Sequence, residues 1–244
     1  MKLLLVNGNT TQAVTDRVVA EATRCAAPGT AITGVTARFG VSIVSTEAEE
    51  EIAGHAVLDV LAASFAGHDA AILAISFDTA LLGARQIVPI PVLGMTEASL
   101  LTACLLGRRF GLISFGQGSR WMYLDLVRRV GLAQRMAGLE TIELTDSAAY
   151  LREGGQDAAV IDASERLIAA GADAVVVAGA AVAGIAHRLR AQLSVPLLDG
   201  IACAVGQAET LVRLGLHQRV AAAPLTGGST ATGIDPSLRQ LLSR

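Results

Sequence analysis

The segment GHDAAILAIS at residues 67–76 is repeated later in the chain as GADAVVVAGA at residues 171–180. Asp69 and Asp173, the first aspartates of the two copies, are 104 positions apart (173 − 69). In each copy, a glycine and an aspartate precede an unbroken apolar run, which is typical of a strand buried on both faces of a parallel sheet. Self-similarity over such a distance predicts two related α/β halves.

Each copy is followed by a second short apolar run behind a proline, IPVLGMTEAS at residues 90–99 and VPLLDGIACA at residues 195–204. Around these runs, strand signals alternate with helix signals along the whole chain. Strands are expected at residues 3–6, 31–39, 70–75, 92–95, 110–114, 139–144, 174–178 and 197–199. Helices are expected at about residues 9–26, 46–65, 79–87, 97–106, 119–130, 157–169, 183–193, 200–214 and from 236 onward.

This alternation indicates parallel sheets with right-handed crossovers. We therefore assign the chain to the α/β class, as two pseudo-symmetric Rossmann-like (flavodoxin-like) domains. The N-terminal domain is expected to comprise residues 1–98 plus 215–244, and the C-terminal domain residues 99–214. Ligands of such folds bind beyond the carboxyl ends of the strands, so the active site is expected in the cleft between the domains.

The composition excludes several classes of function. The 244 residues are 52% hydrophobic but only 3% aromatic, and the net charge is −3. Without a basic patch or aromatic surface, nucleic acid is not an expected partner. No apolar run reaches the roughly 18 residues that cross a bilayer, and the N-terminus becomes polar too soon for a signal peptide. We expect no membrane partner and a cytoplasmic location.

No cofactor and no metal are expected. Cys25, Cys104 and Cys203 are isolated, and the four histidines are scattered without the spacing of metal ligands. Lys2 is the only lysine and opens a predicted buried strand, which argues against a pyridoxal Schiff base. Glycine motifs for phosphates or dinucleotides are also absent from the sequence.

The sequence has one aromatic cluster. Trp121, Met122 and Tyr123 follow a glycine-rich loop. They are interpreted either as interface anchors of a homo-oligomer or as a wall of the substrate site, with core packing as the simpler alternative. A homo-oligomer is expected.

Five loops at strand ends are predicted to meet at the cleft, at residues 7–10, 42–46, 76–79, 114–119 and 179–181. Because several of them precede helices, their backbone N–H groups favour an anionic or carbonyl-rich ligand. The expected substrate-binding residues are Asn9, Thr10, Ser45, Thr79, Ser114, Phe115, Gly179, Ala180 and Ala181. The expected catalytic residues are Ser76 and Asp78, and Asp78→Asn is predicted to abolish turnover.

Each of these polar residues also has a structural interpretation. Asn9 is a suitable helix N-cap, and Ser76 and Asp78 suit a turn before a helix. Glu97 and Asp199 stand at corresponding strand ends of the two copies. They are either caps or cleft carboxylates adapted to acid–base chemistry.

Six stretches carry a family resemblance. They are LLLVNGNTT (3–11), GVSIVSTEAEE (40–50), LAISFDTALLGARQIVPIPVLGMTEAS (73–99), RFGLISF (109–115), VVVAGAAVAGIAHRL (175–189) and VPLLDGIACAV (195–205). In these stretches the chain resembles the aspartate/glutamate/hydantoin racemase superfamily, and its hydantoin (allantoin) racemase branch most closely. The resemblance runs from Met1 to about Leu216 and implies two pseudo-symmetric α/β domains with a cofactor-free site between them.

The resemblance also implies a chemistry in which two cysteines face the substrate from opposite sides. One thiolate removes the α-proton and the other thiol returns it. The motifs place the first cysteine at Ile75 or Ser76 and the second at Gly179 or Ala180, and none of these is a cysteine. A serine hydroxyl is far less acidic than a thiol and does not simply replace one. The fold therefore carries over, and the two-thiol mechanism does not.

We predict a cofactor-independent, racemase-like isomerase that acts next to a carbonyl of a small carboxylate, amide or cyclic ureide. Two alternatives remain open. One is a hydrolase or decarboxylase of the same superfamily that uses Asp78 and Ser76. The other is a non-catalytic protein that binds a small molecule. Removal of the cysteines by engineering is a third possibility.

Overall fold

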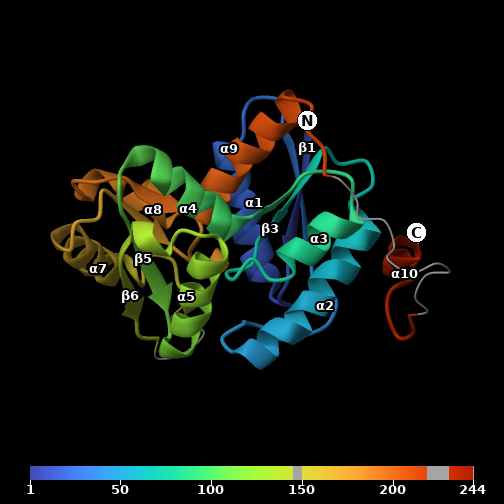
Figure 1. Ribbon diagram of the computed structural model, residues 1–244, viewed down its shortest axis with the longest axis horizontal. Helices are drawn as coiled ribbons and strands as arrows, with labels where there is room; N and C mark the ends of the chain where they lie inside the picture. Colours follow the sequence, from blue (N-terminus) through green and yellow to red (C-terminus); the bar gives the residue numbers. More distant parts are fainter. Residues whose placement is uncertain (145–149, 219–230, 244) are drawn as a thin grey trace.

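The computed structural model describes residues 1–144, 150–218 and 231–243. It contains two four-stranded sheets in which every pair of neighbouring strands is parallel. The first sheet has the order β2-β1-β3-β4 and the second the order β6-β5-β7-β8. The predicted α/β class with two related halves is therefore confirmed, and Figure 1 shows the halves side by side.

The N-terminal half is built from β1 (Lys2–Asn7), α1 (Gln12–Cys25), β2 (Ala31–Thr36), α2 (Glu47–Ser64), β3 (Ala70–Leu73), α3 (Leu81–Ile87), β4 (Val92–Gly94) and α4 (Met95–Leu106). The C-terminal half is built from β5 (Phe110–Phe115), α5 (Arg120–Arg129), β6 (Met136–Ile142), α7 (Asp157–Ala169), β7 (Ala174–Val177), α8 (Ile185–Leu189), β8 (Leu197–Asp199) and α9 (Gly200–Arg213). A last helix, α10 (Pro236–Leu242), follows. All eight predicted strands are present. The second is shorter than predicted and ends at Thr36.

The repeated aspartates explain why both copies begin alike. Asp69 accepts a hydrogen bond from the backbone N–H of Lys2 at 2.6 Å, and Asp173 accepts one from the backbone N–H of Arg109 at 3.0 Å. Each carboxylate thus holds the beginning of the central strand beside its own. The apolar run that follows is completely buried in both β3 and β7, as the unbroken pattern predicts.

Two helices cross between the halves. Helix α4 follows a strand of the first sheet but packs against β7, whereas α9 follows a strand of the second sheet but packs against β3 and β4. The two helices also pack on each other, and Gln207 of α9 donates to the carbonyl of Ala98 in α4 at 2.8 Å. The predicted boundary at residues 98 and 99 therefore falls inside a helix that contacts both halves, as Figure 1 shows.

Local helix signals are confirmed in some places and wrong in others. Thr46 and Glu49 form the predicted capping box of α2. Asn9 is not an N-cap, because α1 begins at Gln12 and its N-cap position is Thr11. Asp78 does not cap the helix that follows it, since the N-cap of α3 is Ala80 with φ 62°. Its carboxylate is directed elsewhere, as described below.

The aromatic cluster divides between surface and interior. The Trp121 side chain is 64% exposed, while Met122 and Tyr123 are buried. Trp121 as an anchor of an oligomer interface remains a prediction. Among the described residues, no helix is both long and apolar enough to cross a membrane.

Candidate active site

A cavity of about 400 Å³ opens between the two halves, at the carboxyl ends of the strands. This is where parallel α/β sheets place their ligand sites. The N-terminal half contributes Asn9, Val14, Ser42, Ile43, Val44, Ser45, Glu49, Ile75, Ser76 and Phe77. The C-terminal half contributes Phe115, Gly116, Gly118, Ser119, Tyr123, Leu144, Tyr150, Ala180 and Ala181.

The loops that follow β3 and β7 are equally long, although φ is positive at Gly179 but not at the equivalent Ile75, and at Asp78 but not at the equivalent Val182. Both lead into a helix through a left-handed residue, Ala80 with φ 62° before α3 and Gly184 with φ 88° before α8. These two residues are 104 positions apart, the same spacing as the repeated aspartates. The loops therefore match residue for residue, which pairs Ser76 with Ala180.

The two loops present equivalent backbone donors to the cavity. Each is closed by a turn of equal geometry, from the Asp78 N–H to the Ile75 carbonyl and from the Val182 N–H to the Gly179 carbonyl, both at 3.2 Å. Within the described chain, the N–H groups of the residues inside these turns have no hydrogen-bond partner. They belong to Ser76, Phe77, Ala180 and Ala181. All four residues line the cavity, so its floor is built from unpaired N–H donors of both halves.

Two arginines hold these loops from across the cleft. Arg129 of α5, in the C-terminal half, donates to the carbonyl of Phe77 at 3.2 Å. Arg17 of α1, in the N-terminal half, donates to the carbonyl of Ala181. Phe77 and Ala181 are equivalent positions of the repeat, so each half fixes the loop of the other with one arginine.

Asp78 lies away from the cavity, which corrects its expected place in the site. Its carboxylate accepts hydrogen bonds from the N–H groups of Thr96 at 2.9 Å and Glu97 at 2.6 Å, in the first turn of α4. Gly94 allows this approach, because a Cβ there would overlap the carboxylate. The side chain is 2% exposed, and burial raises the pKa of Asp78 to about 7 against the two hydrogen bonds, which lower it.

In the C-terminal half, the residue that caps the corresponding helix lies at the end of the preceding strand. Asp199 stands at the end of β8, the place that Gly94 has at the end of β4. It caps its own helix, α9, by accepting from the N–H of Ala202 at 3.0 Å. Burial raises its pKa to about 6. Glu97 forms an ion pair with Arg85. Of the two interpretations, the structure places Asp199 as a cap.

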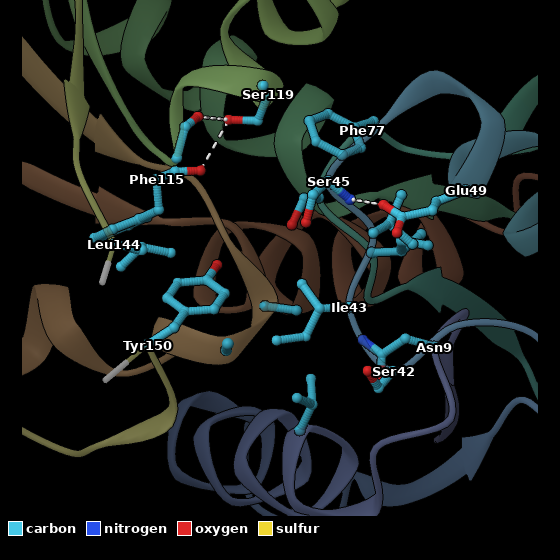
Figure 2. Close-up of a pocket in the computed structure, with 18 of the residues that line it drawn as sticks. Asn9, Ser42, Ile43, Ser45, Glu49, Phe77, Phe115, Ser119, Leu144 and Tyr150 are labelled. Atoms are coloured by element: carbon cyan, nitrogen blue, oxygen red, sulfur yellow. Dashed lines mark hydrogen bonds between the residues drawn. The ribbon is translucent and has the colours of Figure 1, made fainter. Parts of the chain in front are cut away.

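Two polar side chains present unpaired atoms to the cavity. Asn9 accepts with its Oδ1 from the Asn7 side chain at 3.1 Å and from the Thr11 N–H at 2.9 Å. These two bonds orient the amide, and its Nδ2 has no partner among the described residues. Glu49 accepts with Oε2 from the N–H groups of Ser45 at 2.8 Å and Thr46 at 3.0 Å. Its Oε1 has no partner in the described chain (Figure 2).

Two tyrosines complete the lining. Burial raises the pKa of Tyr123 well above its usual value, nearby Tyr150 adds to the rise, and the neighbouring Ser76 side chain opposes it. Burial likewise raises the pKa of Tyr150 far above its usual value, and the charge of Arg17 opposes this. Both phenols are therefore neutral at physiological pH.

The predicted site residues separate into two groups. Those that line the cavity are Asn9, Ser45, Ser76, Phe115, Ala180 and Ala181, and Gly179 lies directly beside Tyr150. Those that do not line it are Thr10, Thr79, Ser114 and Asp78. Thr10 bonds the carbonyl of Val41 instead, and Thr79 bonds Glu50. Ser114 is fully buried beside Thr141, because neighbouring residues of a strand face opposite sides.

Sequence reasoning missed Glu49 and Tyr150. Glu49 is recognisable from sequence as a capping-box residue, but not as a cavity residue. Tyr150 carries no motif, and only the tertiary structure brings it to the end of β7. Tyr123 lines the same cavity. A place in the wall of the substrate site was one of the alternatives predicted for Tyr123.

The described lining of the cavity contains no arginine, lysine, histidine or cysteine. Cys25 is at the end of α1 beside Glu21, and Cys104 and Cys203 lie in α4 and α9. No cluster of three or more potential metal ligands is found among the described residues. The polar groups available for chemistry are thus hydroxyls, one amide, one carboxylate and backbone N–H groups.

Paired parallel sheets with flanking helices and a cavity at the carboxyl ends of their strands place the chain among α/β proteins of two related halves. The Asp/Glu/hydantoin racemase family matches residues 3–208, so the chain belongs to this family of racemase-like enzymes. The hydantoin racemase of Pseudomonas sp. (strain NS671) is 29% identical over 225 residues, covering 88% of this chain and 87% of the relative. That of Paenarthrobacter aurescens is 27% identical over 218 residues, covering 88% and 92%.

Solved structures agree with this assignment. The allantoin racemase from Klebsiella pneumoniae has a TM-score of 0.86 at 30% identity and covers 98% of this chain and 99% of its own. The allantoin racemase from Pseudomonas fluorescens has a TM-score of 0.79 at 29% identity, covering 93% and 99%. Arylmalonate decarboxylase, at 15% identity and a TM-score of 0.61 over 99% of both chains, shares the fold.

Proposed function

We propose that this chain is a cofactor-independent racemase-like enzyme that exchanges the proton on a carbon next to a carbonyl, and that its substrate is a neutral cyclic ureide or amide. The observation that carries the substrate class is the absence of any cationic side chain from the described lining of the cavity. A substrate carboxylate is commonly recognised through arginine or lysine. The carbonyl oxygens of a ureide need only neutral donors, and this cavity supplies those.

The donors would act on the substrate as follows. The Asn9 amide would hold one carbonyl oxygen, since its Nδ2 is the unpaired end of an oriented group. The N–H groups of Ser76, Phe77, Ala180 and Ala181 would hold the oxygen next to the reacting carbon. Negative charge develops on that oxygen when the α-proton leaves. Fixed N–H donors stabilise such an oxyanion without reorganising.

Glu49 would accept the proton. It is the only acidic residue in the described lining, and its Oε1 is free while Oε2 is anchored by two backbone N–H groups. The electrons of the broken C–H bond would pass to the carbonyl oxygen as an enolate. Ser76, which lines the cavity, would add a hydroxyl donor to the same oxygen. We propose a structural role for Asp78, because its carboxylate already caps α4.

This chemistry would proceed without a thiol. Ser76 and Ala180 stand at the equivalent ends of the two loops, and the three cysteines lie outside the described lining of the cavity. Removal of an α-proton requires a base and oxyanion stabilisation, and both are available from other groups here.

The test is proton NMR in D₂O at neutral pH, with a protein-free blank. The neutral panel is allantoin and 5-substituted hydantoins, and the anionic panel is aspartate, glutamate and a substituted malonate. The proposal predicts loss of the α-proton signal in the neutral panel alone. Exchange confined to the anionic panel would contradict the substrate class. New product signals without exchange would indicate a hydrolase or decarboxylase, and ligand-induced thermal stabilisation without either change would indicate a binding protein.

A further inference from the structure

The absence of a side chain at Gly179 leaves a space that the Tyr150 side chain fills. The φ of Gly179 is 119°, and a Cβ at this position would overlap the hydroxyl oxygen of Tyr150. The phenol oxygen therefore lies where a side chain of residue 179 would begin, at the end of β7. In the loop after β3, the equivalent residue is Ile75, whose side chain also lines the cavity.

The Tyr150 ring is buried, while its hydroxyl faces the cavity without a hydrogen-bond partner among the described residues. The side chain is only 8% exposed, and no hydrogen bond to its oxygen is found among the described residues. Figure 2 shows the hydroxyl pointing into the cavity rather than into the protein. A hydroxyl in this position is available to a bound substrate as a hydrogen-bond donor and acceptor.

The phenol is also held rigidly. Its ring packs on Phe115 with centroids 5.2 Å apart. Arg17 donates to the carbonyl of Leu151, the next residue, at 2.7 Å, and also to the carbonyl of Ala181. One arginine therefore fixes both the segment that carries Tyr150 and the loop that carries Gly179. Such support is what positions a group for chemistry.

Tyr150 and Glu49 come from opposite halves and lie on opposite sides of the cavity, as Figure 2 shows. A substrate carbon between them would present one face to the carboxylate and the other to the phenol. This arrangement suits inversion at that carbon, which requires proton transfer on both faces.

We propose that Tyr150 is a catalytic residue that gives and takes the proton on the face of the substrate carbon opposite Glu49. The proposal rests on the proposed function above. In one direction, Glu49 takes the α-proton and the C–H electron pair becomes the enolate. The enolate carbon then forms a bond to the proton of the Tyr150 hydroxyl, whose O–H electrons remain on the phenolate. Afterwards the Glu49 proton passes to water and the phenolate takes a proton from water. In the other direction a proton first passes through water from Tyr150 to Glu49. The phenolate then takes the α-proton, the C–H electron pair becomes the enolate, and protonated Glu49 gives its proton to the opposite face of the carbon.

The surroundings of the phenol fit this role. Burial keeps the pKa of Tyr150 above its usual value, so the neutral donor is the resting form. The charge of Arg17 acts in the opposite direction and would stabilise the phenolate once it forms. Proton transfer by a positioned group contributes about 10²- to 10⁴-fold to a rate.

The test separates the two faces of the carbon. Each enantiomer of a 5-substituted hydantoin is incubated with protein in D₂O, and α-proton exchange and optical rotation are followed together. In Tyr150→Phe, racemisation should fall by about 100-fold or more. The enantiomer whose C–H faces Glu49 should still exchange its proton, with retention, while the other enantiomer should not. Glu49→Gln should show the opposite preference.

Controls separate chemistry from folding. Trp121→Phe changes an exposed aromatic residue outside the site and should leave both rates unchanged. A merely structural role of Tyr150 would lower both exchange rates together and lower Tm, which would overturn the proposal. Unchanged racemisation in Tyr150→Phe would also overturn it, while leaving the proposed function intact. Absence of exchange in the unaltered protein would overturn both.

Discussion

The loops after β3 and β7 have several backbone features in common but differ in their side chains and in φ at two equivalent positions. Both have a pair of unpaired N–H groups, a left-handed residue before the next helix and a carbonyl held by an arginine of the other half. The first loop carries Ser76, and the carboxylate of its Asp78 accepts hydrogen bonds from the first turn of α4. The second carries only small or apolar side chains, and Tyr150 enters over Gly179. The N–H pairs, which have no partner among the described residues, suit binding of carbonyl oxygens, whereas the differing side chains make the two faces of the cavity chemically unlike.

The largest effect is expected from filling the space over Gly179. Gly179→Ala would drive the Tyr150 hydroxyl out of its place and would strain a backbone with φ 119°. We expect exchange activity to fall by about 100-fold or more. The measurement is the initial rate of α-proton exchange.

Gly67→Ala is the matched control for that experiment. Gly67 also has a positive φ, 78°, but nothing lies within 4 Å of an added Cβ. It should reproduce the backbone strain without the loss of activity. Equal activity losses in the two variants would mean that strain, and not Tyr150, is responsible.

Replacing the two arginines that donate to the loop carbonyls, Arg17 and Arg129, should have the next largest effect. Arg17→Met should lower kcat by about 10- to 100-fold, because Arg17 holds both the second loop and the segment of Tyr150. Arg129→Met should lower it less, since Arg129 holds only one carbonyl. Arg128→Met, which breaks an exposed ion pair with Asp125, is the control and should be neutral. A larger decrease in kcat for Arg129→Met than for Arg17→Met would contradict the greater importance that we assign to the second loop.

A smaller effect is expected at Asp78. Asp78→Asn replaces one acceptor of the helix cap by an amide donor and should lower the free energy of unfolding by about 1–2 kcal/mol. Activity of the folded variant should stay within a few-fold, contrary to the sequence-based expectation that this change abolishes turnover. Denaturant titration measures the change in the free energy of unfolding, and exchange kinetics on the same sample measure the activity. Complete loss of exchange in a folded variant would return Asp78 to the mechanism.

The smallest effect concerns pH. Burial raises the folded-state pKa values of Asp78 to about 7 and of Asp199 to about 6, above the ordinary value of 3.8. Between about pH 4 and 7 the folded chain therefore binds more protons than the unfolded chain, so these two groups make stability decrease as pH rises. Thermal unfolding across this window should show a shallower decrease in Asp78→Asn than in the unaltered protein. Parallel curves would contradict the raised pKa of Asp78.

Much of the fold could be predicted from sequence because its signals are local. Unbroken apolar runs mark β3 and β7, and the capping box of Thr46 and Glu49 marks the start of α2. The cleft was predictable too, since the carboxyl ends of parallel strands converge. Ser114 and Phe115 show the limit, because only the observed face of β5 decides which of the two residues reaches the cavity.

The remaining parts of the site depend on contacts between distant residues. The Asp78 carboxylate finds its partners at Thr96 and Glu97, 18 and 19 positions away, and no local pattern encodes that choice. Tyr150 reaches the end of β7 only because Gly179 has no side chain and Arg17 of the other half holds its neighbour. Such roles arise from packing, which periodicity and motifs do not describe.

The most direct test of the central claim is α-proton exchange by a variant without any cysteine. Cys25→Ala, Cys104→Ala and Cys203→Ala together would remove every thiol from the chain. None of the three belongs to the described lining of the cavity. We expect the triple variant to exchange the α-proton of a neutral hydantoin in D₂O at the rate of the unaltered protein. Loss of exchange in a folded triple variant would show that the chemistry depends on a thiol and would contradict the account.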